Sequence, residues 1–431
     1  MVSEQILNLF LSAEKGITTD SRLCGPGMIF FALKGESFNG NEFVPQALEN
    51  GCIAAVSDDE SHKGRENVIV VDDVLVALQT LARDYRRTLD VPVLGLTGSN
   101  GKTTTKELIN AVLAKKYKTH ATKGNLNNHI GVPLTILSTP KDVEFLIVEM
   151  GANHIGEIKL LASIAEPTHG IITNIGRAHL EGFGGLEGVK KGKKELYDYI
   201  KATGGVAFAS GKHPKVVESS EGLDRVVFGL EENLPKAWFE SEKEKVFKWK
   251  SEGFESNNCK THLEGDYNLE NIEAAICIGE YFKVERKEIA QAIEDYIPSN
   301  NRSQVIKGEK NTVILDAYNA NPSSMSKALK SFAENIEGEK IVVLGDMREL
   351  GEYSVDSHNE IIELCDGLRL NAIFVGNEFA EAINKGGKVC VFYSSVEELI
   401  SDASRVLSFT SNTVLLKGSR GMKMERLLPH L

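Results

Sequence analysis

The chain has 431 residues, which at about 150 residues per domain corresponds to roughly three domains. Hydrophobic residues make up 42% and charged residues 26%, and the net charge is −12, so we expect more than one buried core and no broad basic face for nucleic acid. We expect no membrane span and no signal peptide, because no apolar run approaches roughly 18 residues and no basic region precedes the apolar residues near the N-terminus. The six cysteines are scattered without a C-x-x-C pair, which is typical of free thiols in a reducing compartment and predicts a cytoplasmic enzyme.

The first predicted segment, residues 1–89, has the pattern of a small α/β domain. Short apolar runs bounded by turn-forming residues predict strands at 27–33, 52–56 and 68–71. Asp72 or Asp73 can cap a helix whose apolar residues recur at helical spacing as far as Tyr85.

The second predicted segment, residues 90–298, alternates strands and helices. The strands expected at 91–96, 145–150, 170–174 and 206–209 are typical of βαβ units in a parallel sheet. Short strands with charged turns over 226–262 predict an antiparallel edge. Two helices, at 268–282 and 286–296, and a turn-rich joint at 298–301 complete this segment.

The third predicted segment, residues 299–431, repeats the alternation. Its expected strands lie at 313–316, 341–345, 372–376, 389–392 and 414–417. This pattern predicts a second doubly wound, Rossmann-like sheet. The predicted fold class is therefore α/β with three domains: a small N-terminal domain, a central phosphate-loop domain with a parallel sheet, and a Rossmann-like C-terminal domain.

A glycine-rich turn between the first central strand and its helix has the composition of a phosphate-binding loop. Such a loop needs inward-pointing N–H donors, a helix N-terminus and a lysine; Lys102 can reach the β- and γ-phosphates and Thr103 can bind Mg²⁺. The match to G-x-x-x-x-G-K-[ST] is partial, because Leu96 stands where the pattern has glycine, and the alternative is a turn with a solvated lysine. The predicted nucleotide-binding residues of the loop are Gly98, Ser99, Asn100, Gly101, Lys102, Thr103 and Thr104.

Seven short motifs follow one another along the chain. They are T-G-S-N-G-K-T (97–103), G-N-L-N-N-H-I-G-V-P (124–133), E-M-G-A-N-H (149–154), A-H-L-E-G-F-G (178–184), D-A-Y-N-A-N-P (316–322), G-D-M-R-E-L-G (345–351) and K-G-S-R (417–420). In this order they resemble the motifs of the Mur ligase family, the ATP-dependent amide-forming enzymes of peptidoglycan precursor synthesis. The resemblance covers nearly the whole chain.

The resemblance to the Mur ligase family also bears on Glu149 and His179, whose roles the sequence alone leaves open. Glu149 ends an apolar strand, where it could serve a hard cation or be an ordinary exposed glutamate. A lone histidine such as His179 is more often structural or solvated, but the family's matching histidine is a magnesium ligand.

Four lysines, at positions 190, 191, 193 and 194, form a charge cluster on a predicted helix that starts near Leu186. Their simplest interpretation is a solvated helix face. In the family one lysine of this helix is carbamylated by carbon dioxide, which requires a neutral amine, and alignment selects Lys193. The resemblance thus implies two Mg²⁺ sites with ligands from Thr103, Glu149, His179 and carbamylated Lys193, and it implies catalytic roles for Lys102, Lys193, His179 and Glu149.

Further residues match family positions that contact the nucleotide. Asn271 closes G-D-Y-N-L-E-N, which resembles the family's H-N-x-x-N, although Tyr267 replaces the usual histidine and its role stays open. Asn268 is also placed to cap a helix. The matching positions in the third segment are Arg302 and Asp316, and an aspartate after an apolar strand can bind a ribose hydroxyl.

The predicted substrate contacts begin in T-D-S-R (19–22), which resembles the family's uridine-nucleotide signature. Serine and arginine are suitable donors to a diphosphate. Asn39 and Asn41 stand in F-N-G-N where relatives carry F-D-G-H, so their roles stay open. The full predicted set is Ser21, Arg22, Lys34, Asn127, Asn128, Asn319, Lys417 and Arg420, of which the last two are alternatively solvated.

The reaction implied by the resemblance joins D-alanyl-D-alanine to UDP-N-acetylmuramoyl tripeptide through an acyl phosphate, with ATP, Mg²⁺ and a lysine carbamate as cofactors. The third residue of the tripeptide, lysine or diaminopimelate, stays open, and a monomer is expected. The alternatives are another amide ligase of the family, such as a tripeptide-forming or folylpolyglutamate synthase-like enzyme, and a phosphate-loop module that binds nucleotide without ligating anything.

Overall fold

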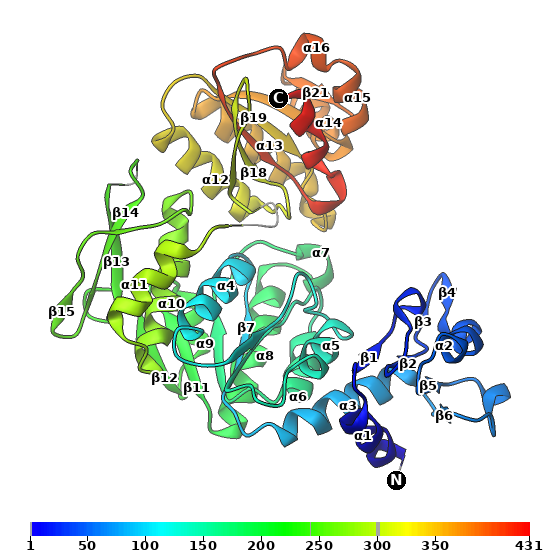
Figure 1. Ribbon diagram of the computed structural model, residues 1–431. Helices are drawn as coiled ribbons and strands as arrows, with labels where there is room; N and C mark the ends of the chain where they lie inside the picture. Colours follow the sequence, from blue (N-terminus) through cyan, green and yellow to red (C-terminus); the bar gives the residue numbers. More distant parts are fainter. Residues whose placement is uncertain (1, 242, 299–301) are drawn as a thin grey trace. The chain divides into compact units, whose positions relative to one another are not determined.

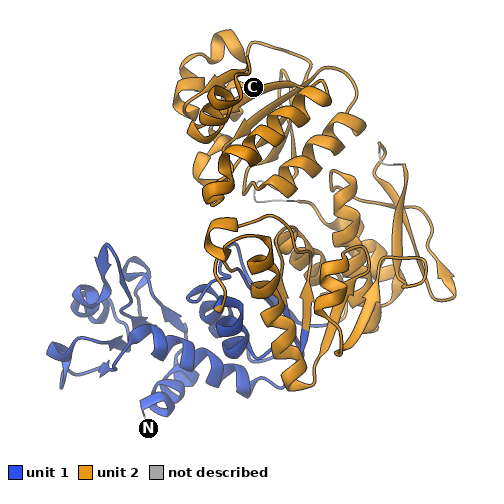
Figure 2. Cartoon of the chain, turned by 180° about the vertical axis from the view of Figure 1, so that it is seen from behind, with its two compact units in different colours: residues 1–95, 117–151, 157–169 blue, residues 96–116, 152–156, 170–431 orange. Residues whose placement is uncertain are grey.

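The structure is a computed structural model that describes residues 2–241, 243–298 and 302–431 (Figure 1). Helices and strands alternate along the chain in several sheets, so the predicted α/β class is confirmed. Two compact units are present, one of residues 1–95, 117–151 and 157–169, and one of residues 96–116, 152–156 and 170–431 (Figure 2). Residues 299–301 of the joint predicted at 298–301 lie outside the described residues. The domain boundaries predicted between residues 89 and 90 and between residues 298 and 299 stay predictions.

The N-terminal sheet has four parallel strands in the order β1-β2-β5-β6. Its strands are β1 (Ile17–Thr18), β2 (Ile29–Phe31), β5 (Ala54–Ser57) and β6 (Val68–Val70). The neighbouring elements are α1 (Val2–Ser12), α2 (Val44–Glu49), α3 (Val74–Thr88) and the hairpin of β3 (Lys34–Gly35) and β4 (Phe38–Asn39). Of the two predicted caps, Asp73 starts α3, because its carboxylate accepts the N–H of Val76 at 2.9 Å.

The central sheet has six strands in the order β12-β11-β10-β7-β9-β8. The strands are β7 (Val93–Thr97), β8 (Thr119–Ala121), β9 (Phe145–Glu149), β10 (His169–Ile172), β11 (Val206–Ser210) and β12 (Asp224–Phe228). The helices between them are α4 (Lys102–Leu113), α5 (Gly131–Leu137), α6 (Glu157–Ala165), α7 (Leu180–Phe183), α8 (Leu186–Thr203) and α9 (Pro214–Ser219). The carboxyl ends of β7 and β9 lead directly into the phosphate-loop and E-M-G-A-N-H motifs.

The predicted antiparallel edge over 226–262 is wrong in its placement. β12 pairs parallel with β11 in the central sheet, and the antiparallel strands form a separate small sheet. Its strands are β13 (Lys236–Ser241), β14 (Val246–Ser251), β15 (Phe254–Glu255) and β16 (Cys259–Lys260), followed by α10 (Leu269–Tyr281) and α11 (Arg286–Asp295). The small sheet has an apolar face of its own, with Phe247 and Trp249 buried, so it does not need the central sheet as a pairing partner.

The C-terminal sheet has six strands in the order β17-β18-β22-β19-β20-β21. Its strands are β17 (Gln304–Lys307), β18 (Thr312–Asp316), β19 (Lys340–Gly345), β20 (Asn371–Val375), β21 (Val391–Tyr393) and β22 (Thr413–Lys417). Its helices are α12 (Pro322–Asn335), α13 (Ser354–Gly367), α14 (Asn377–Gly386), α15 (Val396–Ser401) and α16 (Ala403–Val406). All pairs are parallel except β17–β18, an antiparallel edge that the sequence did not predict. Because β18, β19 and β22 run parallel, the three motifs that follow them begin at one edge of the sheet.

Candidate functional site

The phosphate loop runs from the end of β7 into the N-terminus of α4. Gly98 has φ 147° and Gly101 has φ 77°, backbone conformations that favour glycine. A Cβ atom at Gly98 would lie 2.0 Å from the Thr173 hydroxyl oxygen, and one at Gly101 would lie 2.6 Å from Oδ1 of Asn271. Both glycines are therefore required by the close packing of the loop as well as by its turn.

The loop is held by the segment that follows β10, which the sequence did not single out. The backbone N–H of Ser99 donates to the Asn174 carbonyl and that of Asn100 to Oδ1 of Asn174, both at 3.0 Å. The Thr173 hydroxyl donates to the Asn100 carbonyl at 2.6 Å. Lys102 Nζ donates to the Gly98 carbonyl at 2.8 Å, so its side chain curls back over the loop. Thr103 is buried and Thr104 half-buried on the first turn of α4.

Asn271 reaches the start of α4 from α10. Its Oδ1 accepts the Thr105 hydroxyl at 2.8 Å and its Nδ2 donates to Oδ1 of Asn268 at 2.7 Å. Asn268 stands at the N-cap position of α10 but makes no capping hydrogen bond with its side chain, because its Oδ1 already accepts the Nδ2 of Asn271; its own Nδ2 donates to the Glu264 carbonyl at 2.6 Å. Asn271, a predicted nucleotide contact, thus lies beside the phosphate loop.

Glu149, at the end of β9, is 1% exposed, so its interpretation as an ordinary exposed glutamate is wrong. Its carboxylate accepts Nδ2 of Asn127 at 2.9 Å, and its N–H donates to the Thr122 hydroxyl at 2.9 Å. Two predicted residues, Glu149 and Asn127, therefore lie together. The side chain of Asn128 serves its own turn, since Oδ1 accepts the N–H of Gly131 at 2.8 Å.

His179 precedes α7, and its side chain is half-buried. Its Nδ1 is hydrogen-bonded to the Glu349 carboxylate, and this bond is the main reason that the pKa of Glu349 lies below its ordinary value. The same stretch also contacts two helices of the C-terminal part, α13 and α12: Arg177 forms an ion pair with Glu360 at 2.5 Å, and its N–H donates to the Ser323 hydroxyl at 3.2 Å.

Lys193 differs from the other lysines of the α8 cluster. It has no exposed surface, its Nζ donates to the Ala152 carbonyl at 3.1 Å, and it lies 5.2 Å from the centre of the Phe183 ring. Lys190 and Lys194 instead form surface ion pairs with acids. The solvated-face interpretation is therefore wrong for Lys193. The sequence held a signal for this, because Lys193 lies four residues after Val189 and three residues before Leu196, on the same apolar face of the helix.

The predicted residues of the C-terminal segment divide into buried and exposed ones. Lys417 is 2% exposed and donates to the Asp316 carboxylate at 2.5 Å, so its solvated alternative is wrong. Arg420 is exposed and forms an ion pair with Glu425 at 2.7 Å. The Arg302 guanidinium stacks on the Tyr318 ring at 3.7 Å. Asn319 uses its own side chain to accept the N–H of Ala320 at 2.9 Å.

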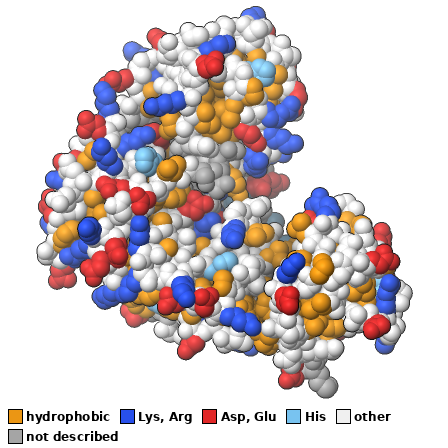
Figure 3. Space-filling view, viewed as in Figure 1, with side chains coloured by type: hydrophobic (Ala, Val, Ile, Leu, Met, Phe, Trp, Pro, Cys, Tyr) orange, Lys and Arg blue, Asp and Glu red, His pale blue; other side chains and the backbone are white. Residues whose placement is uncertain are grey.

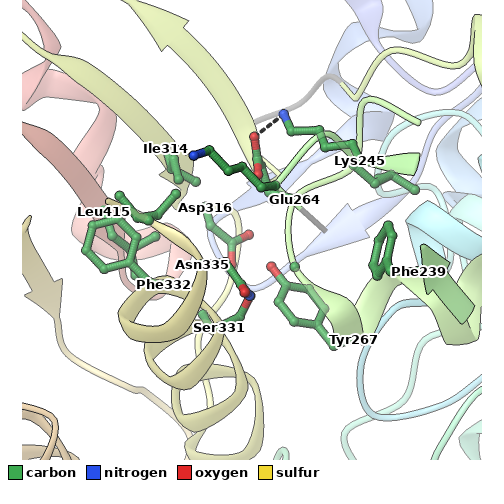
Figure 4. Close-up of a pocket in the computed structure, with 15 residues that line it drawn as sticks. Phe239, Lys245, Glu264, Tyr267, Ile314, Asp316, Ser331, Phe332, Asn335 and Leu415 are labelled. Carbon is green, nitrogen blue, oxygen red and sulfur yellow. Dashed lines mark hydrogen bonds and ion pairs between the residues drawn. The ribbon is translucent and has the colours of Figure 1, made fainter. Parts of the chain in front are cut away.

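A pocket of about 210 Å³ lies beside Asp316 and Tyr267 (Figure 4). Phe239 and the ion-paired Lys245 and Glu264 face it from one side, and residues of α12, β18 and β22 close the other side. The Tyr267 hydroxyl is 3.0 Å from that of Ser303, and burial raises the pKa of Tyr267. Tyr267 thus forms part of the wall of this pocket, whereas Asn271 and Arg302 are not among its lining residues.

The predicted uridine-nucleotide residues lie in two segments next to the N-terminal sheet: Ser21 and Arg22 in a 3-10 turn after β1, and Lys34 in β3 of the hairpin. Arg22, which follows Ser21 directly, is exposed and forms an ion pair with Asp20 at 2.6 Å. Lys34 forms an ion pair with Asp58 at 2.9 Å. Asn41 is buried, and its side chain accepts the Ser57 hydroxyl at 2.7 Å and donates to Asp58 at 2.7 Å. Asn41 therefore contributes to packing of this domain, and Asn39 accepts its N–H at 3.2 Å.

Within the described residues, no three His, Cys, Asp or Glu side chains converge as a metal site. The predicted ligands nonetheless fit Mg²⁺ in their donor chemistry. Glu149 offers a buried carboxylate and Thr103 a buried hydroxyl, both hard oxygen donors. One ring nitrogen of His179 is hydrogen-bonded to a carboxylate, which leaves the other available as a ligand.

The comparisons with known proteins decide the family. Three family descriptions match consecutive parts of the chain: the Mur ligase family catalytic domain at residues 15–86, the Mur ligase middle domain at 96–279, and the Mur ligase glutamate ligase domain at 301–420. The UDP-N-acetylmuramoyl-tripeptide–D-alanyl-D-alanine ligase of Bacillus subtilis is 35% identical over 427 residues, covering 96% of this chain and 93% of that protein. The chain belongs to the Mur ligase family.

Solved structures of the family agree with this assignment. MurF from Acinetobacter baumannii superposes with a TM-score of 0.88 at 31% identity, covering 99% of this chain and 97% of that one. MurF from Thermotoga maritima, in complex with ADP, gives 0.84 at 28% identity, covering 96% of each chain. This Mur ligase therefore has the three-domain family fold and is an ATP-dependent ligase that forms C–N bonds. Acidic and basic side chains intermingle on the face in Figure 3, and no helix of the described residues is long and apolar enough to span a membrane.

Proposed function

We propose that this Mur ligase joins D-alanyl-D-alanine to UDP-N-acetylmuramoyl tripeptide in peptidoglycan precursor synthesis, with ATP converted to ADP and phosphate. The observation that carries the proposal is the 35% identity, over nearly the whole of both chains, to the Bacillus subtilis enzyme of that activity. A contact within the chain supports it: Nδ2 of Asn321, in the D-A-Y-N-A-N-P motif, donates to Oδ1 of Asn100 in the phosphate loop at 2.7 Å. Motifs from the central and C-terminal sheets therefore meet at one place.

Amide formation from a carboxylate in water requires activation. In the proposed reaction, a carboxylate oxygen of the tripeptide attacks the γ-phosphorus of ATP, which forms an acyl phosphate and expels ADP. The amine of D-alanyl-D-alanine then attacks the acyl carbon, loses a proton and expels phosphate. Lys102 neutralises negative charge on the β- and γ-phosphates so that the two anions can approach. Bound Mg²⁺ would add to this neutralisation, held by Thr103, Glu149 and His179.

The three ligands are proposed to bind at three sets of loops. The uridine diphosphate lies at Ser21, Arg22 and Lys34 of the N-terminal domain. The nucleoside of ATP lies toward Asn271, Arg302 and Asp316, beside the pocket lined by Tyr267. The incoming dipeptide binds at the carboxyl edge of the C-terminal sheet, and the remaining predicted substrate contacts are Asn127, Asn128, Asn319, Lys417 and Arg420.

Lys193 is the position at which we propose a carbamate. Its complete burial and its location on α8, away from the surface ion pairs of Lys190 and Lys194, support the choice of this lysine. A carbamate would convert a cation into a carboxylate-like ligand for Mg²⁺. Carbon-13 NMR of protein equilibrated with ¹³C-bicarbonate tests the assignment: a carbamate resonance that is absent from Lys193→Ala supports it, and an unchanged spectrum overturns it.

A phosphate-release assay tests the proposed function. With ATP and UDP-N-acetylmuramoyl tripeptide, release should depend on D-alanyl-D-alanine. Equal release with D-alanine, a diamino acid or glutamate would refute the proposal and favour another amide ligase of the family. Release without any amine acceptor would favour a nucleotide-binding module. The same assay with tripeptides ending in lysine or diaminopimelate identifies the third residue of the tripeptide. The cytoplasmic location and the monomeric state of the enzyme stay predictions.

A further inference from the structure

The G-D-M-R-E-L-G motif follows β19 and has no assigned role in the proposed reaction. It begins at the carboxyl edge of the C-terminal sheet, and its glutamate, Glu349, is 170 residues away from His179 in the sequence. The two side chains nevertheless meet, with Nδ1 of His179 against the Glu349 carboxylate. The contact therefore depends on the tertiary fold and joins two different motifs.

The backbone at both residues is shaped for this contact. His179 has φ 53° and Glu349 has φ 64°, left-handed conformations that non-glycine residues adopt rarely. A second bond holds the same two segments together, because the N–H of Glu181 donates to the Glu349 carbonyl at 3.3 Å. Gly351 also lies close to Glu181, since a Cβ atom there would be 3.1 Å from Cγ of Glu181.

The chemistry of the pair is that of a carboxylate orienting an imidazole. A carboxylate that accepts the Nδ1–H of a histidine fixes the tautomer and the ring orientation, and it leaves Nε2 as the lone-pair donor. Ligand histidines are held in this way in metal sites, where the carboxylate partner contributes about 10- to 100-fold to metal affinity.

We propose that Glu349 is a positioning residue that holds His179 in the Nδ1–H tautomer, with Nε2 free to bind the divalent cation of the nucleotide site. The inference rests on the proposed role of His179 as a magnesium ligand. It gives the C-terminal motif a function: Glu349 completes a metal ligand that the central domain supplies.

The first experiment reads the tautomer without metal or turnover. In protein labelled with ¹⁵N-histidine, the His179 signals are assigned by their loss in His179→Gln, and long-range ¹H–¹⁵N correlation spectra distinguish the two tautomers. We expect the Nδ1–H form in the wild type and a loss of that preference in Glu349→Ala. The same tautomer distribution in both proteins would overturn the proposal.

The second experiment measures Mn²⁺ affinity in the presence of a non-hydrolysable ATP analogue by electron paramagnetic resonance. Glu349→Ala should weaken Mn²⁺ binding about 10- to 100-fold, and Glu349→Asp should restore part of the affinity. The matched control is Glu360→Ala, which removes the ion pair with Arg177, two residues from His179, but does not touch the imidazole. Equal losses in Glu349→Ala and Glu360→Ala would mean that Glu349 only tethers the two segments and would overturn the proposal.

The third variant separates this inference from the proposed function. If His179→Ala binds Mn²⁺ as tightly as the wild type, His179 is not a metal ligand, and the metal-directed part of the inference fails. The ligase activity itself is judged independently by phosphate release that depends on D-alanyl-D-alanine.

Discussion

Replacing Gly101 by alanine tests whether the phosphate loop is shaped by its contact with Asn271. Two costs follow from the structure. The φ of 77° places alanine in the left-handed region, at about 1–2 kcal/mol. The new Cβ would also lie 2.6 Å from Oδ1 of Asn271, so this side chain must move and release the Thr105 hydroxyl, which is 1% exposed. Leaving a buried hydroxyl unsatisfied costs about 1–3 kcal/mol, so Gly101→Ala should destabilise by about 2–5 kcal/mol.

A matched glycine isolates the backbone cost. Gly204, the C-terminal cap of α8, has φ 69°, and a Cβ there would meet nothing within 4 Å. Gly204→Ala should therefore cost only the left-handed backbone term, about 1–2 kcal/mol. Urea unfolding of the nucleotide-free protein, followed by the fluorescence of Trp238 and Trp249, measures both variants.

A double-mutant cycle with Asn271→Ala then isolates the contact. Once the amide is absent, the alanine at position 101 has no atom to displace, so the combined loss should be smaller than the sum of the single losses by about 1–2 kcal/mol. Equal losses for Gly101→Ala and Gly204→Ala, or strictly additive losses in the cycle, would refute the reasoning.

Three other variants test neighbouring parts of the site. Lys102→Met should raise the KM for ATP at least about 100-fold, because a charge-assisted contact to phosphate is lost, and should leave the melting temperature nearly unchanged. Lys193→Ala should lose most activity, and added bicarbonate should not restore it; a near wild-type rate would remove Lys193 from the catalytic set. Glu270 is desolvated, but its hydrogen bond with His213 and the charge of Lys327 lower its pKa from 4.5 to about 2. The lowered pKa of Glu270 contributes about 3 kcal/mol to the free energy of unfolding at neutral pH, and this contribution should be lost as the pH falls from about 5 to 2. In urea titrations, Glu270→Gln should flatten that part of the dependence of stability on pH.

Local patterns in the sequence were sufficient for the fold class. The alternation of apolar runs and helical periodicities predicted the parallel sheets, because hydrophobic spacing reflects the period of each element directly. The glycine-rich turn before Lys102 was identified on the same grounds, since a chain that turns sharply from a strand into a helix needs residues that accept φ > 0. The antiparallel strands after β12 were misplaced, because short strands carry no signal for the sheet to which they belong.

Burial was decided by the tertiary structure. Lys193 and Lys191 are two residues apart on one helix, yet one is fully buried and the other exposed, because successive helical residues point in different directions and only packing shows which face is covered. Lys417 looked equally compatible with solvent, but it lies at the carboxyl end of the inner strand β22, against Asp316 of β18.

What the sequence determined by itself is therefore the set of elements, the phosphate loop and the order of the family motifs, because each of these is encoded within a few neighbouring residues. The partners of the chemical groups were determined only by the tertiary structure. Asn271 against Gly101, Asn100 against Asn321 and His179 against Glu349 are pairs from distant parts of the chain, brought together by the packing of α10 against α4 and by the meeting of loops that follow strands of two different sheets. Such pairs leave no local pattern, because a hydrogen bond between distant residues constrains their positions in space and not their spacing in the sequence.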